Sequence, residues 1–291
     1  MKQGIPSSSA EGAAFFRAAE SMRPEHERVC YDPFAKDFLG SKKTYLLSNS
    51  HLLKRIIRDT ERNTPGTFGC VAGRTRYIDD YLKACIDAGI KQLVILGAGY
   101  DSRAYRFREL KGKAKIFELD HQTTQSVKIE RVTNIFGSVP DNVIYVPIDF
   151  ENDKLDKRLF KNGYDRNLKT LFIWEGVTMY ITAEAVNETL AFIATNSGKG
   201  SSIIFNYISK SFLDRTYELE YANKLLRYLE GEEPFRYAID DRGIEVFLSE
   251  RGFNQVNNVT GEFFKRVYFK GINENRKVCC LCGFATATVR P

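Results

Sequence analysis

Glycine and acidic residues stand at the ends of several short apolar runs in this 291-residue chain. The run "LVILGAGYDS" contains Gly97 and Gly99, "FELD" ends in Asp120, and "FIWEG" places Glu175 directly after the only tryptophan. Without a Cβ, the two glycines could let the backbone approach a bound ligand, or they could simply form a tight turn from strand to helix. The acidic side chains could bind hydroxyl or cationic groups.

Asp120 lies 21 residues after Gly99. A carboxylate at this point can accept hydrogen bonds from both hydroxyls of a ribose, or it can cap the helix that begins "HQTTQ". An ionised Glu175 is costly to bury without a partner. An ammonium or sulfonium group of a ligand could be that partner, and so could a nearby lysine or arginine.

A third run ends "PIDF", where Asp149 and Phe150 could hydrogen-bond and stack on an adenine. The spacing from glycine to acidic residue is shared by nucleotide dehydrogenases and by enzymes that use S-adenosylmethionine. The dinucleotide pattern G-x-G-x-x-G would need glycine at position 102, where this chain has Ser102. The sequence therefore argues against a nicotinamide-dependent oxidoreductase, although it leaves that alternative open.

The spacing of the apolar runs along the sequence predicts the strands and helices that position these residues. Runs that end near residues 97, 120, 150, 176 and 208 leave room between them for single helices, which predicts a parallel sheet wound with helices. The following division of one domain is predicted: a helical extension (1–90), an α/β core (91–208), a helical cap insertion (209–240), and a C-terminal helix with a β-hairpin (241–291). The hairpin strands would be "EFFKRVYF" and "KVCCLCGFATATV", joined by a turn.

Composition narrows the classes of function. The net charge of +6 comes from interspersed charges, so it does not argue for a nucleic-acid partner. The six cysteines lack the spacing of a metal site, and we expect reduced thiols and no metal. With no signal-like segment and no run long enough to span a membrane, the sequence predicts a cytoplasmic protein.

The motifs "DPFA", "GRTRYIDDYL", "LVILGAGYDSRAYRF", "FELD" and "IWEGVTMYIT", in this order, resemble the leucine carboxyl methyltransferase family. The resemblance covers nearly the whole chain and is closest to the microbial branch of S-adenosylmethionine-dependent O-methyltransferases. It implies a class I methyltransferase fold: a Rossmann-like seven-stranded sheet whose last strand is antiparallel, with an N-terminal helical extension and a helical cap.

The resemblance also implies roles for individual residues. Arg74, in the "RT" segment, would bind the carboxylate of S-adenosylmethionine; without the resemblance it would be read as a surface arginine. The other implied donor-site residues are Gly97 and Gly99 against the amino-acid part, Asp120 on the ribose, Asp149 and Phe150 beside the adenine, and Glu175 near the amino group and the methyl-bearing centre. No phosphatase-binding feature is recognisable, so the leucine carboxylate of the eukaryotic members is not the expected acceptor.

The predicted function is O-methylation of a small molecule that carries a carboxylate or hydroxyl. None of the three histidines follows a strand as a poised base would, and no catalytic residue is assigned. The cap insertion is rich in aromatic residues, which predicts a mainly apolar acceptor pocket: Phe212, Tyr217, Tyr221, Tyr228, Phe235 and Tyr237. A nicotinamide-dependent oxidoreductase and a non-catalytic protein that retains the fold are the alternatives.

Overall fold

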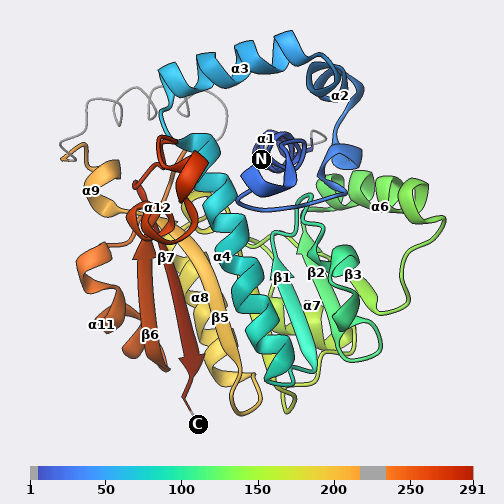
Figure 1. Ribbon diagram of the computed structural model, residues 1–291. Helices are drawn as coiled ribbons and strands as arrows, with labels where there is room; N and C mark the ends of the chain where they lie inside the picture. Colours follow the sequence, from blue (N-terminus) through green and yellow to red (C-terminus); the bar gives the residue numbers. More distant parts are fainter. Residues whose placement is uncertain (1–5, 217–233, 291) are drawn as a thin grey trace.

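The computed structural model describes residues 6–216 and 234–290, and within these ranges seven strands form one sheet in the order β3-β2-β1-β4-β5-β7-β6 (Figure 1). The strands are β1 Gln92–Leu96, β2 Lys115–Asp120, β3 Val143–Pro147, β4 Thr170–Trp174, β5 Ser202–Ile208, β6 Phe253–Thr260 and β7 Cys282–Val289. Strands β1 to β5 pair in parallel, whereas β7 is antiparallel to both of its neighbours. The predicted sheet with an antiparallel last strand is confirmed.

Helices precede the sheet and cover both of its faces. The α-helices are α1 Ser8–Ser21, α2 Ser41–Ser48, α3 Ser50–Asn63, α4 Thr67–Asp87, α5 Arg103–Arg106, α6 Gln122–Phe136, α7 Leu155–Lys161, α8 Ala183–Thr195, α9 Lys210–Leu213, α11 Ile244–Ser249 and α12 Gly261–Tyr268. Figure 1 shows α4 crossing the front of the sheet, with α8 behind the same strands and α1 above their carboxyl ends.

Alternate residues of each central strand pack into two separate layers. Leu93 and Ile95 of β1 face a cluster that includes Leu82 of α4. Val94 and Leu96 face a second cluster that includes Leu190 of α8. Because both faces are covered, all residues of β1 after Gln92 are apolar and the sequence shows no alternation.

The predicted C-terminal hairpin was wrong in one strand. The segment "EFFKRVYF" forms helix α12, and the strand that pairs with β7 is the preceding β6. Phe264 of α12 is fully buried against α4, where a Cβ on Gly73 would lie 2.8 Å from the Phe264 side chain. Strand β6 forms the edge of the sheet, and of its residues only Phe253 and Val259 are buried. An edge strand needs few apolar residues, so its sequence gave little signal.

Of the predicted cap insertion, the structure describes α9 and the segment that starts at residue 234. Phe212 is fully buried, while Phe235 and Tyr237 are partly buried against the two core clusters. The aromatic residues Tyr217, Tyr221 and Tyr228 lie outside the described residues.

Candidate functional site

Arg74 and Glu175 meet at the carboxyl edge of the sheet. Helix α4 presents Arg74, and the loop after β4 presents Glu175, with 2.6 Å between Nε of the arginine and Oε1 of the carboxylate. The side chains are only 13% and 12% exposed, so the alternative of a surface arginine was wrong. The Nε–H does not point along this contact, which makes the pair ionic without a hydrogen bond. Within the described residues, no hydrogen bond involves the terminal nitrogens of Arg74, so they remain available to a ligand.

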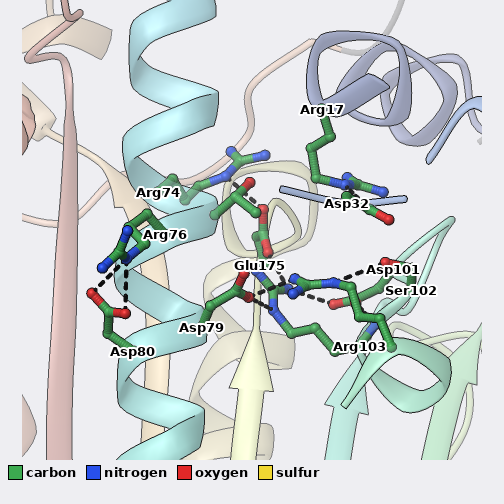
Figure 2. Close-up of polar contacts among 12 residues, drawn as sticks. Arg17, Asp32, Arg74, Arg76, Asp79, Asp80, Asp101, Ser102, Arg103 and Glu175 are labelled. Carbon is green, nitrogen blue, oxygen red and sulfur yellow. Dashed lines mark hydrogen bonds and ion pairs between the residues drawn. The ribbon is translucent and has the colours of Figure 1, made fainter. Parts of the chain in front are cut away.

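A second arginine holds Glu175 from the other side. Arg103, the first residue of α5, donates a hydrogen bond from Nη1 to Oε2 of Glu175 at 2.8 Å (Figure 2). The same nitrogen donates to Asp101 at 2.6 Å, and Nε donates to Asp79 of α4 at 2.8 Å. Asp79 also pairs with Arg106 at 2.6 Å. The side chain of Arg103 therefore ties α4 to the carboxyl ends of β1 and β4.

We call this set the arginine–carboxylate network. It contains three cations and three anions: Arg74, Arg103, Arg106, Asp79, Asp101 and Glu175. Its formal charge is zero, which suits a ligand group that carries both an ammonium and a carboxylate.

Arginines of the network keep two of its carboxylates, Glu175 and Asp101, ionised. Burial alone would raise the pKa of Glu175, but the charges of Arg74 and Arg103 outweigh burial and hold this pKa below its ordinary value. Burial is likewise outweighed at Asp101, mainly by Arg103, and its pKa is also lowered. Near neutral pH the site thus presents fixed negative charges to a cationic group.

The glycine loop after β1 is packed closely by its neighbours. Gly97 and Gly99 have φ angles of 67° and 41°, a region that favours glycine. A Cβ on Gly97 would lie 2.1 Å from Cγ2 of Val177, and one on Gly99 would lie 3.0 Å from Cβ of Ala10 in α1. Both glycines therefore form the tight turn and also leave room for side chains from two other elements.

Asp120, the last residue of β2, fixes this loop. Its Oδ2 accepts a hydrogen bond from the Gly99 N–H at 2.5 Å, and its Oδ1 accepts one from the His121 N–H at 2.6 Å. The side chain of His121, and not that of Asp120, caps helix α6. Burial raises the pKa of Asp120, and the two backbone hydrogen bonds partly offset this effect. Each carboxylate oxygen retains a further lone pair that could accept from a ligand hydroxyl.

Asp149 and Phe150 follow β3 and lie apart from the network. Asp149 accepts hydrogen bonds from the Glu151 N–H at 3.0 Å and from the Asn152 side chain at 2.9 Å, so it closes a local turn. Phe150 is partly buried against the core cluster that contains Trp174. In the described ranges, no hydrogen bond or ion pair joins either residue to the other predicted site residues.

The N-terminal helix reaches the same loop through a buried arginine. Arg17 of α1 pairs with Asp32 at 2.8 Å and donates a hydrogen bond to the backbone oxygen of Tyr100 at 2.5 Å. Sequence reasoning missed Arg17, Arg103 and Asp79 because their charges look like those of a solvated helix surface. The available signal was "DSRAYR", where two arginines three residues apart follow directly on the glycine turn.

Comparison with known proteins decides the family. The model of the leucine carboxyl methyltransferase family matches residues 10–194, which is more than half of the chain. The chain belongs to the leucine carboxyl methyltransferase family. The match includes most of α1, the glycine loop and the whole arginine–carboxylate network.

The names of individual proteins that are similar to this chain agree with the family. A Bacillus subtilis protein provisionally named an S-adenosyl-L-methionine-dependent methyltransferase, YktD, is 25% identical over 285 residues, covering 90% of this chain and 91% of its own. A Mycobacterium tuberculosis protein with a similar provisional name is 31% identical over 212 residues, covering 71% of this chain and 66% of its own. The crystal structure of a provisionally named methyltransferase from Thermobifida fusca aligns with a TM-score of 0.61 at 11% identity, over 100% of this chain and 97% of its own. That similarity supports the class I methyltransferase fold.

Membership of the leucine carboxyl methyltransferase family confirms the predicted class, a methyltransferase that depends on S-adenosylmethionine. The nicotinamide-dependent oxidoreductase has no support from these relatives. In residues 6–216 and 234–290, no helix combines the length and apolar composition needed to cross a bilayer.

Proposed function

We propose that this chain transfers the methyl group of S-adenosylmethionine to an oxygen atom of a small molecule, either a carboxylate or a hydroxyl. The observation that carries the proposal is the buried pairing of Arg74 with Glu175 at the carboxyl edge of the sheet. In open α/β sheets, ligands bind at this edge.

The site chemistry fits the donor. The unengaged terminal nitrogens of Arg74 can form a bidentate contact with the donor carboxylate, and Glu175 can accept from its ammonium group. Both partners are already ionised, so binding needs no change of protonation. The other proposed contacts are the backbone of Gly97 and Gly99 with the amino-acid part, Asp120 with the ribose, and Asp149 and Phe150 with the adenine.

The donor supplies an electrophilic methyl group on a sulfonium, so the protein contributes alignment and the exclusion of water. A strong base is unnecessary when the acceptor is already ionised. This agrees with the histidines: His26 and His51 are exposed, and the His121 side chain caps α6. The absence of a placed imidazole favours a carboxylate or an easily ionised hydroxyl.

Aromatic side chains that follow β4 and β5 support an apolar acceptor. The ring of Phe235 lies 5.5 Å from that of Tyr180 and 6.2 Å from that of Phe212, measured between centroids. The segment that carries Phe235 is held by a hydrogen bond from the Arg236 N–H to the backbone oxygen of Met179 at 2.7 Å. Tyr180 and Phe235 are only partly buried, and they could form one wall of an acceptor pocket next to the loop that carries Glu175. Phe212 is fully buried and packs against Phe235.

The test is to incubate the protein with donor labelled in the methyl group and a small-molecule extract, and to identify the labelled product by mass spectrometry and NMR. We expect a methyl ester or methyl ether. Arg74→Gln should weaken binding of S-adenosylhomocysteine by about ten- to a hundredfold, the usual scale for a hydrogen bond to a charged group. Arg76→Gln, which changes an exposed arginine on the same helix, is the matched control. A product methylated on nitrogen or carbon would refute the oxygen specificity, and no labelled product with any extract would favour the non-catalytic alternative.

A further inference from the structure

We propose that Arg103 is a positioning residue that sets the orientation of Glu175 for the ammonium group of the donor without contacting the donor itself. The inference rests on the donor site proposed above, and it assigns a role to an arginine that the donor does not reach.

The hydrogen bonding of Glu175 distinguishes the roles of Arg103 and Arg74. In the part of the chain that the structure describes, the only hydrogen bond to the Glu175 carboxylate comes from Nη1 of Arg103 at 2.8 Å. The contact with Arg74 is closer, at 2.6 Å, but its Nε–H does not point at the carboxylate. Arg103 can therefore keep the carboxylate in place while the terminal nitrogens of Arg74 bind the donor carboxylate.

Arg103 is itself fixed from two further directions. Its Nε donates to Asp79 of α4, and its Nη1 is shared with Asp101 in the loop before α5 (Figure 2). Three carboxylates from three separate segments thus define the plane of one guanidinium. That plane in turn defines where the carboxylate of Glu175 can lie.

Burial excludes direct contact of Arg103 with a ligand. The residue is 2% exposed, and its remaining nitrogen, Nη2, is buried without a hydrogen-bond partner in the described ranges. Protein atoms therefore cover the Arg103 side chain, and Arg103 acts on the donor through Glu175. Lysine would keep the charge, but one ammonium cannot reproduce the fork that spans Asp79 and Glu175.

The experiment compares two ligands by isothermal titration calorimetry. S-adenosylhomocysteine carries the amino-acid end, and 5′-methylthioadenosine has the same nucleoside and sulfur without it. We expect Arg103→Lys to weaken S-adenosylhomocysteine binding by about ten- to a hundredfold and 5′-methylthioadenosine binding by less than about twofold. Arg76→Lys is the matched control, since Arg76 makes a two-oxygen contact with Asp80 on the exposed side of α4. It should leave both affinities unchanged.

If Arg103→Lys does not fold, Asp79→Asn loosens the same guanidinium from α4 and should give the same selectivity with a smaller effect. Equal weakening of both ligands would overturn the inference, because it would show that Arg103 supports the whole loop. Unchanged affinity for both ligands would overturn it as well. A wild-type protein that binds neither ligand, or binds both equally, would instead refute the proposed donor site, on which the inference depends.

Discussion

Replacing Glu175 by glutamine removes one negative charge from the arginine–carboxylate network and keeps the shape of the side chain. Loss of one member of a buried ion pair costs about 3–5 kcal/mol. We expect the lower end, because Arg103 keeps Asp79 and Asp101 at 2.8 and 2.6 Å, and Arg74 is 13% exposed and can gain water. With an unfolding entropy of about 0.6 kcal/mol/K for 291 residues, about 3 kcal/mol lowers Tm by about 5 °C.

The pH dependence of this loss follows from the lowered pKa of Glu175. A carboxylate whose folded pKa is depressed stabilises the protein above its unfolded pKa, and this contribution is lost as pH falls through the folded pKa. The difference in Tm between wild type and Glu175→Gln should therefore be full at pH 7 and should shrink below the ordinary value of 4.5.

Thermal unfolding followed by circular dichroism at pH 7 and at low pH measures both effects. Glu151→Gln is the matched control, because Glu151 pairs at 2.6 Å with Arg236 but both side chains are exposed by a third or more. An exposed pair contributes about 0–1 kcal/mol, so this control should barely change Tm. A Glu175→Gln variant as stable as the control at pH 7, or one whose deficit persists at low pH, would refute the reasoning.

Three further variants test the loop and the core beneath it. Burial raises the pKa of Glu118 to about 7 despite its ion pair with Lys128. Between pH 4.5 and 7 the folded state holds a proton that the unfolded state has lost, so the free energy of unfolding should decrease as the pH rises through this range. In urea titrations, Glu118→Gln should make this decrease smaller. Gly97→Ala should cost about 1–3 kcal/mol through overlap with Val177 and a positive φ, and Val177→Ala should restore part of it in a double-mutant cycle. Asp120→Asn should cost about 1–3 kcal/mol in chemical unfolding, because an amide cannot accept both backbone hydrogen bonds; an unchanged midpoint would contradict this.

The central strands could be predicted because a strand buried on both faces is mostly apolar, and after their first residue β1 and β4 are apolar to the end. Glu175 stood out for the same reason, since an acidic residue directly after such a strand needs a partner. Edge strand β6 was missed because only part of one face is buried, and local pattern alone could not separate α12 from a strand.

The partners of Glu175 were harder to predict than Glu175 itself. Arg74 was identified only through the family resemblance, and Arg103 was not identified at all. Both are charged residues on helices, where the sequence pattern is that of a solvated surface. Their burial depends on α4 and α5 meeting at one sheet edge, and that meeting is a property of the tertiary fold.

Titration of the wild-type protein with S-adenosylhomocysteine, repeated with Arg74→Gln, tests the central claim most directly. The claim is that Arg74 and Glu175 bind the amino-acid end of the donor at the carboxyl edge of the sheet. The account predicts saturable binding at one site, with affinity reduced by about ten- to a hundredfold in Arg74→Gln. Equal affinity of the two proteins for S-adenosylhomocysteine would contradict it.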